Sequence, residues 1–382
     1  MDTLNNGILR DEFPHSRTQI YLNHCAISPI PTRSLEAANE HLKQRNSGAV
    51  DTFELDEPVI ESARNHAANL INSESIETIA FIPNTSHGIN LIAAGISWEV
   101  GDEIILSDIE FPTNVYPYLL SEEHKTNVIR IDGSDGKVPV DRVEEAITPR
   151  TRVVALSAVQ FLSGFRADLK AIGQLCRENN IYFVVDAIQA LGQVPVDVRD
   201  MNIDALVAGG HKWLLGTQGQ GLMYVSERMQ QELKPVFPGW LSVENPWDLL
   251  NYDQSLQTTA RQYEGGMYNG PGIRVLEKSL ELLNEVGVEK INKHITELQN
   301  YFEEQIRHIP VRRYGSAESI HRSGILAYTI PESTDSEKLM ATFRENDIKV
   351  SVREGILRIA PHLYNNADEM DRTADVLKQA VT

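Results

Sequence analysis

The stretch VVDAIQALGQVPVDVRDMNIDALVAGGHKWLLGTQGQG, residues 184–221, decides the fold. It contains two short apolar runs, which we interpret as buried strands. Asp186 ends the first run, and Lys212 follows the second within a glycine-rich turn. Because ligands of open α/β sheets bind at the carboxyl ends of the strands, the sequence predicts that this acid and this amine lie at one ligand-binding edge.

Further apolar runs extend outward from this stretch, between about residue 77 and residue 226. The full set is ETIAFI, DEIILSD, NVIRID, TRVVALSAV, IYFVVDA, DALVAGG and GLMYVS. Runs that are apolar on both faces are typical of a parallel sheet covered by helices on both sides. One covering helix is predicted in DLKAIGQLCRENN, with Asp168 as N-cap and Cys176 on the buried face. We therefore predict a doubly wound, mostly parallel, seven-stranded α/β domain.

The pattern changes after residue 257. A long amphipathic helix, broken near Gly287, precedes the strand segments SGILAYTI and IKVSVREGILRIAP and a closing helix, ADEMDRTADVLKQAV. This order predicts a smaller C-terminal α+β domain. We expect an N-terminal segment at 1–19 that packs on the small domain, a large domain at 20–257 and the small domain at 258–382.

Composition excludes several classes of partner. The formal net charge is −19 and the pI is about 5.0, whereas polyanions are bound through surplus Lys and Arg, so neither nucleic acid nor an anionic membrane is expected. The two cysteines, Cys25 and Cys176, form no CxxC pair, which indicates neither a disulfide framework nor a zinc site. With no apolar leader and no apolar run of membrane length, a soluble cytoplasmic protein is expected.

Four kinds of polar or aromatic feature fall at predicted strand ends. NTSHG begins a helix, where Thr85, Ser86 and free backbone N–H groups suit a phosphate, although a plain N-cap is the ordinary interpretation. Phe111 in a loop is either a platform for a bound ring or a residue of the hydrophobic core. Taken alone, Asp186 is typical of a helix N-cap and Lys212 of a solvated surface residue. Together they match the needs of pyridoxal 5′-phosphate (PLP). The motifs GxGxxG after a strand, GxxxxGK[ST] and HExxH are missing from the sequence.

The sequence resembles the class V aminotransferase family, PLP enzymes of fold type I that include cysteine desulfurases, kynureninases and isopenicillin N epimerase. The segment YLNHCAISPIP is similar to the family's opening YLDNAATSP, NTSHGINLIA to its phosphate loop, and residues 184–216 to its signature from acid to lysine. EFPTNVY is similar to the kynureninase segment NFPTDLY, whose phenylalanine stacks on the cofactor ring. The segment LRIAPHLYNNADEMDR resembles the one whose arginine holds the substrate carboxylate.

The resemblance implies a role for each matching residue. Lys212 forms the Schiff base and Asp186 pairs with the pyridine nitrogen, as the two catalytic residues. The remaining cofactor contacts are Thr85, Ser86, Phe111, Gln189, His211 and Gly266. The substrate contacts are Arg358, for which Arg353 is a rival, and His24 and Ser28 of the opening segment.

Departures from the family pattern bear on the reaction. NDIKVSVREGILR lacks the nucleophilic cysteine that desulfurases carry before the arginine strand. Met267 stands where the family's threonine reaches the partner subunit's phosphate, so this contact is expected either to be lost or to be remade by the backbone N–H groups of Gly265 and Gly266. Gly209 replaces a serine, and Gln160 is the candidate substitute for the desulfurase asparagine.

The first functional hypothesis is a PLP enzyme that deprotonates Cα of a small amino acid, as an aminotransferase with an oxo acid acceptor. The alternative is a cysteine-independent C–S or C–Se β-lyase, followed by a kynureninase-like hydrolase or an epimerase. A binding or regulatory module that keeps only the scaffold is the non-enzymatic possibility. The resemblance further implies a homodimer with the active site at the subunit interface.

Overall fold

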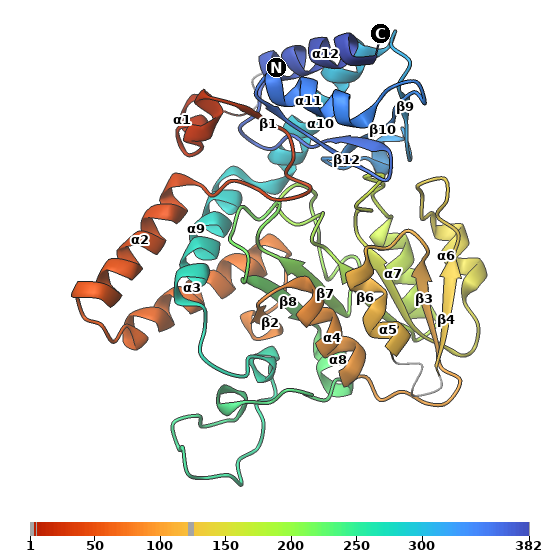
Figure 1. Cartoon of the computed structure of the whole chain (residues 1–382). Coiled ribbons are helices and arrows are strands. Elements are labelled where there is room, and N and C mark those ends of the chain that lie inside the picture. The colour runs from red at the N-terminus through yellow and green to blue at the C-terminus, as the bar shows by residue number, and fades with distance from the viewer. Residues whose placement is uncertain (1–3, 5, 121–125, 382) are drawn as a thin grey trace.

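The computed structural model describes residues 4, 6–120 and 126–381 (Figure 1). Its seven-stranded central sheet has the order β2-β8-β7-β6-β5-β3-β4. The strands are β2 Ile79–Ile82, β3 Glu103–Ser107, β4 Asn127–Ile131, β5 Thr151–Ser157, β6 Tyr182–Asp186, β7 Ala205–Gly209 and β8 Gly221–Val225. The predicted doubly wound, mostly parallel, seven-stranded sheet is confirmed.

One strand, β8, runs antiparallel to both of its neighbours in the central sheet. Strands β3 to β7 pair in parallel, whereas β8 is antiparallel to both β7 and β2. The connection from Gly209 to Gly221 is shorter than the roughly twelve residues that a parallel crossover needs, so β8 can only return as a hairpin. Lys212 lies in this short connection.

Both faces of the sheet are covered, as the apolar runs predict. Successive residues of β6 belong to different clusters, with Phe183 and Val185 in the core on one face and Tyr182 and Val184 in the core on the other. The helices of this domain include α4 Thr85–Gly95, α5 Tyr116–Leu120, α6 Val140–Ala146, α7 Leu169–Glu178 and α8 Glu227–Glu232. Asp168 caps α7 by accepting from Ala171 N at 3.0 Å, as expected.

The C-terminal part forms its own small sheet, in the order β12-β13-β10-β9. Its strands are β9 Arg312–Arg313, β10 Leu326–Thr329, β12 Ser351–Arg353 and β13 Ile356–Ile359, with helices α10 Val288–Ile306, α11 Ser336–Glu345 and α12 Ala367–Val381 around them. A separate pair joins β1 Ile20–Tyr21 in parallel to β11 Ile348–Lys349. The N-terminal α1 Asn6–Asp11 precedes it.

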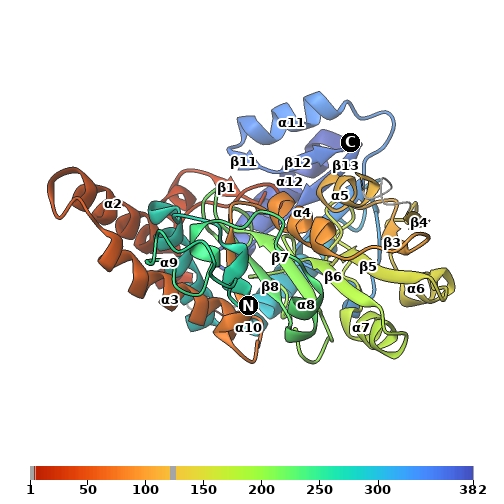
Figure 2. The ribbon, with the colours of Figure 1, turned by 90° about the horizontal axis from the view of Figure 1, so that it is seen from below.

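The long helix is interrupted where the sequence predicts. Helix α9 Gly270–Val286 ends at Gly287, whose φ of 87° is costly for other residues, and α10 starts at Val288. Helix α9 packs against α2 Thr32–Ser47 and α3 Phe53–Leu70, which project together to one side of the sheet (Figures 1 and 2). The boundaries at 19/20 and 257/258 stay predictions, and residues 1–3, 5 and 382 of the outer segments lie outside the described residues.

Both cysteines are buried and free. Cys176 is 1% exposed on the inner face of α7, as expected, and burial raises the pKa of its thiol to about 12. No helix among the described residues is both long and apolar enough to cross a membrane.

Candidate active site

A cavity of about 270 Å³ lies at the carboxyl end of β6, beside the turn that follows β7. Most of the site residues predicted from the sequence line it, namely Thr85, Ser86, Phe111, Asp186, Gln189, His211, Lys212 and Arg358. They come from both sheets and from four separate loops or helix ends, so the fold brings together residues that are far apart in the chain.

Asp186 is the acid of this cavity. It is the last residue of β6, is 2% exposed and accepts a hydrogen bond from Ile188 N at 3.0 Å. Burial raises the pKa of Asp186 to about 7, and the nearby Glu110 adds to this effect while Lys212 opposes it. A carboxyl in this state requires a cationic partner if it is to stay ionised.

Lys212 is the amine. Burial lowers the pKa of its ammonium group, an effect that Asp186 opposes and that Arg358 and Arg353 reinforce. A lowered pKa increases the fraction of neutral amine, the form that attacks a carbonyl carbon or accepts a proton. Burial, with Lys212 next to it, also lowers the pKa of His211.

The N-terminus of α4 forms one end of the cavity. Asn84 caps the helix by accepting from His87 N at 2.9 Å, so the preceding amides of Thr85 and Ser86 face the cavity end of the helix. Thr85 Oγ1 accepts from Gly209 N at 3.0 Å, and Ser86 Oγ lies 2.9 Å from Thr113 Oγ1. A helix N-terminus with two hydroxyls is suited to a phosphate.

Close packing explains two glycines around this end. A Cβ on Gly88 would lie 2.5 Å from Val207 Cγ1, so only glycine lets α4 approach the sheet this closely. A Cβ on Gly209 would lie 3.2 Å from the His211 ring. The family serine would therefore require His211 to shift, which gives a physical reason for this departure.

Phe111 presents an aromatic face to the amine. Lys212 Nζ lies 5.8 Å from the Phe111 ring centroid, and Phe161 contacts the same ring edge to face at 5.2 Å. Phe111 remains 42% exposed because it borders the open cavity. This placement favours a platform over a core residue, and the contact of Phe111 with a cofactor ring stays a prediction.

Arg358 on β13 brings a buried guanidinium from the small domain. It is 2% exposed, donates from Nη1 to Phe161 O at 2.7 Å and from Nη2 to Ser351 Oγ at 3.0 Å, while its buried Nε has no hydrogen-bond partner among the described residues. Arg353 also lines the cavity but is exposed. The pair makes this end of the cavity cationic, as a carboxylate site requires.

Gln189 is held by the protein on both sides of its amide. Nε2 donates to Cys25 O at 2.9 Å, and Oε1 accepts from the Trp213 indole at 2.8 Å. Gln160, the candidate asparagine substitute, is 1% exposed and donates to Glu110 at 2.7 Å, and it is not among the lining residues of the described cavity.

Three predicted contacts lie elsewhere within the described chain. His24 is fully buried, and its ring nitrogens lie 2.7 Å from Ala360 O and 2.9 Å from the Tyr364 hydroxyl, so the ring turns toward the small domain. Ser28 is 6% exposed and meets the site only through its backbone N–H, which donates to His211 O at 2.9 Å. Gly266 is not a lining residue in this subunit either. Their proposed contacts with ligands stay predictions.

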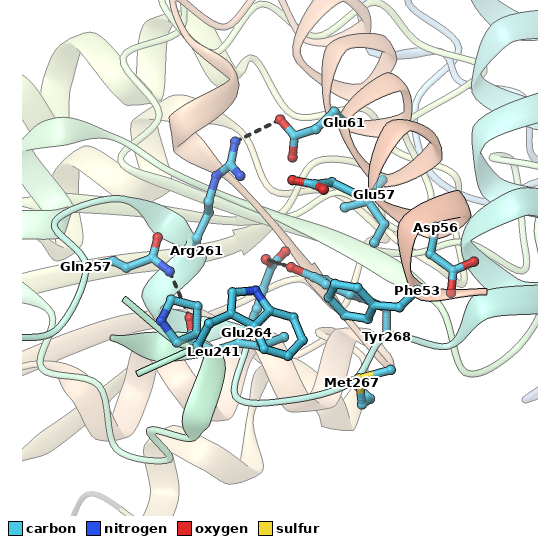
Figure 3. A pocket seen from close by; sticks show the side chains of 13 residues that line it. Phe53, Asp56, Glu57, Glu61, Leu241, Gln257, Arg261, Glu264, Met267 and Tyr268 are labelled. Atoms are coloured by element: carbon cyan, nitrogen blue, oxygen red, sulfur yellow. Dashed lines mark hydrogen bonds and ion pairs between the residues drawn. The ribbon is translucent and has the colours of Figure 1, made fainter. Parts of the chain in front are cut away.

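A second cavity, of about 200 Å³, is lined by Met267, the residue after Gly266 (Figure 3). Here Arg261 points to Glu61 at 2.8 Å, and the Tyr268 hydroxyl donates to Glu264 at 2.6 Å (Figure 3). Met267, the residue in place of the family threonine, lies at its edge and is 65% exposed. No lysine lines this cavity in the described residues, so it offers no amine for PLP.

The sequence interpretation missed several residues of the first cavity. Cys25 lines it, although the thiol is only 1% exposed, and so do Thr113 and Phe161. Glu110 lies just behind Phe111 and is 6% exposed. An acid directly before Phe111 was the available signal for Glu110, whereas the position of Cys25 depends on contacts across the whole chain.

One group of possible metal ligands lies away from the cavity. His66, Glu277 and Glu281 place ligand atoms within 4.8 Å of one another. The Lys278 ammonium lies 3.4 Å from Glu277 and 3.0 Å from Glu281, so these carboxylates already have a cation. The cluster is accounted for as an ion-pair network.

The cavity residues fit PLP by their chemistry. Lys212 supplies an amine of lowered pKa, Asp186 a buried carboxyl that needs a cation, and Phe111 an aromatic face. The unpaired Nε of Arg358 supplies a buried donor without a protein acceptor. These groups have chemistry that PLP and an amino acid substrate would complement.

Comparisons with known proteins agree with this arrangement. The aminotransferase class V family model matches residues 20–366. The chain is 28% identical to a protein named "Probable cysteine desulfurase" from Methanothermobacter thermautotrophicus, over 97% of both chains, and 28% identical to a cysteine desulfurase of Salmonella newport, over 82% of this chain and 80% of that protein. The apo cysteine desulfurase structure from Thermococcus onnurineus shares the fold, with a TM-score of 0.89 and 24% identity over 98% of this chain and 97% of that chain. The chain therefore belongs to the class V aminotransferase family, and it is a PLP-dependent enzyme of fold type I.

Proposed function

We propose that this enzyme is a carbon–sulfur (or carbon–selenium) lyase that acts on a small amino acid such as cysteine. The observation that carries the proposal is the meeting of Lys212, Asp186 and Arg358 in one cavity. The relatives named cysteine desulfurase support the lyase rather than the aminotransferase, which was the first hypothesis from the sequence. The order of the two hypotheses is therefore reversed.

The protein groups divide the work by position. Arg358 binds the substrate carboxylate, because its guanidinium is buried, cationic and not fully paired. Lys212, whose lowered pKa favours the neutral amine, would hold the cofactor through its aldehyde group and would be the base for the Cα proton of the substrate. Asp186 keeps the proton on the pyridine nitrogen, and PLP when bound supplies the electron sink for the Cα electrons.

The proposed fate of the substrate sulfur depends on the absence of a cysteine in the segment before Arg358. The segment NDIKVSVREGILR contains no cysteine to accept sulfur. Elimination from Cβ needs no such residue, since cysteine and water yield pyruvate, ammonia and hydrogen sulfide. A disulfide substrate would release a persulfide in the same way.

An assay with and without an oxo acid tests this function. The purified holoenzyme receives cysteine, cystine, selenocysteine or alanine, each with and without pyruvate or 2-oxoglutarate. We expect sulfide or selenide and pyruvate to be released without an acceptor. Turnover that strictly requires the oxo acid would refute the lyase and restore the aminotransferase.

Replacing Cys25 with alanine tests whether a protein thiol takes part. We expect sulfide release to stay within about twofold of the wild type, because elimination needs no thiol and Gln189 is held by the Cys25 backbone oxygen rather than by the side chain. The matched control is Cys176→Ala, which removes the other buried thiol outside the cavity. Loss of sulfide release in Cys25→Ala alone, with cofactor binding retained, would instead identify Cys25 as a sulfur acceptor.

We also propose that two copies associate as a homodimer. Residues 237–256 include exposed apolar side chains, among them Phe237, Trp247, Leu249, Leu250 and Tyr252, with exposures from 60% to 86%. Exposed apolar patches of this kind usually mark an interface. In the dimer, Gly266 and Met267 would approach the partner's phosphate site. Sedimentation should give twice the chain mass of 42.8 kDa, and a monomer would contradict the proposal.

A further inference from the structure

Glu110 is a buried carboxylate that the mechanism above does not use. It lies between β3 and the short helix Pro112–Asn114 and is 6% exposed. Its Oε1 accepts from Ser157 N at 2.9 Å and from Gln160 Nε2 at 2.7 Å. Its Oε2 accepts from the Ser157 hydroxyl and from Asn114 Nδ2 at 3.1 Å. Both oxygens are therefore fully engaged by donors.

This arrangement is costly for the protein unless the residue has a role. The described residues provide Glu110 with no Lys, Arg or His partner within ion-pair distance, and burial of a carboxylate without a cation is unfavourable. Burial raises the pKa of Glu110, whereas the bonds from Ser157, Gln160 and Asn114 lower it. The four hydrogen bonds offset part of the cost of burying this carboxyl group and fix its position.

The hydrogen bonds of Glu110 join the two loops that form one wall of the active site. Phe111 follows Glu110 directly, and Phe161 follows Gln160. The two rings contact each other at 5.2 Å, and Phe161 O accepts from Arg358 at 2.7 Å. The aromatic platform and the substrate arginine are thus connected through loops that Glu110 ties together.

The same carboxylate is close to the catalytic acid. Ser157, which donates twice to Glu110, pairs with Asp186 across β5 and β6. Apart from burial, which is the larger cause, the charge on Glu110 raises the pKa of Asp186. A second negative charge near Asp186 favours a cation on the cofactor side of the pair.

We propose that Glu110 is the positioning residue of this active site: its carboxylate holds Phe111 and Phe161 in place, so that the cofactor ring and the Arg358 anchor keep a fixed relation. This role deepens the proposed function and rests on PLP occupying the cavity that contains Lys212. Glu110 does not line the cavity and acts through Phe111, Gln160 and Ser157.

The test compares three variants as holoenzymes. Glu110→Gln keeps the shape of the side chain but removes its charge. It also places an amide N–H donor where the protein already supplies donors from Ser157, Gln160 and Asn114. Gln160→Leu keeps the charge and breaks the tie to the Phe161 loop. Asp108→Asn is the matched control, because it removes an exposed carboxylate two residues away from Glu110.

Each variant has its own expected signature. In Glu110→Gln we expect cofactor affinity to fall about tenfold and KM for the amino acid to rise about tenfold. The pH midpoint of the cofactor's visible absorbance should also fall by about one unit, because the cation in the cavity loses a nearby negative charge. In Gln160→Leu we expect KM to rise about tenfold without the shift in midpoint. Asp108→Asn should behave as the wild type.

The outcomes separate this proposal from the lyase assignment. Fluorescence titration of the apo protein with PLP and the pH titration of the bound cofactor are both measured before substrate is added. If Glu110→Gln matches Asp108→Asn in affinity, midpoint and KM, Glu110 has no positioning role. If Glu110→Gln does not fold, the KM of Gln160→Leu decides, and an unchanged value overturns the proposal. If the wild type binds no PLP, the proposed function itself has failed.

Discussion

Lys212→Ala is expected to reduce turnover by at least about 10⁴-fold, the largest loss of activity that we expect from any single substitution in the site. The amine has a lowered pKa because it is buried, and it faces Asp186 and the Phe111 ring within one cavity. No other lysine lines that cavity in the described part of the chain, so the variant has no substitute amine.

Covalent attachment provides the measurement that is independent of the substrate. Borohydride treatment of the wild type should fix PLP to the peptide that contains Lys212, as mass spectrometry would show, and Lys212→Ala should show no such adduct. The variant should still bind PLP without a covalent bond, through α4 and Asp186. Lys170→Ala is the control, because Lys170 is an exposed lysine paired with Asp200. Turnover in Lys212→Ala close to that of the control would refute the role of this residue.

Arg64→Met is expected to give the largest loss of stability, about 3–5 kcal/mol in the free energy of unfolding. Arg64 is fully buried and donates to Glu264 from Nη1 at 2.8 Å and from Nη2 at 2.6 Å, and also to Ile79 O at 2.7 Å. Methionine has a similar length and leaves the Glu264 carboxylate buried without its cation. Because Glu264 directly precedes Gly265 and Gly266, the loop proposed to face the partner should also loosen.

Denaturant unfolding measures this effect. The double variant Arg64→Met, Glu264→Leu removes both charges and should recover most of the lost stability. A loss below about 1 kcal/mol in Arg64→Met, or no recovery in the double variant, would contradict this account.

The sequence predicts the sheet well because β6 and β7 are apolar on both faces, and short runs of this kind are typical of strands in a sheet that is covered by helices on both sides. Asp186 and Lys212 could be identified because they end or follow these strands. Arg358 required the resemblance, since nothing local distinguishes it from Arg353. In the structure, Arg358 is buried and Arg353 is exposed, which is a property of the small-domain packing.

Side-chain direction was less predictable than position along the chain. The opening segment does reach the cavity, but it contributes Cys25 and Ala26, while the His24 ring turns to Tyr364. A motif match predicts where a residue lies along the backbone. It does not predict the contacts with residues more than 300 positions away that orient the His24 ring. For the same reason Gln160 and Glu110 were not recognised as a bonded pair.

The reversal of β8 has a consequence for how the enzyme can move. Lys212 occupies a hairpin whose two strands are each bonded to further strands, and Gly210 N donates to Gln220 O at 2.8 Å across its base. These hydrogen bonds leave the backbone around Lys212 little freedom to move when a ligand leaves. We therefore expect the backbone at Lys212 to stay in place during substrate exchange, so that any rearrangement involves other walls of the cavity, such as the strand that carries Arg358.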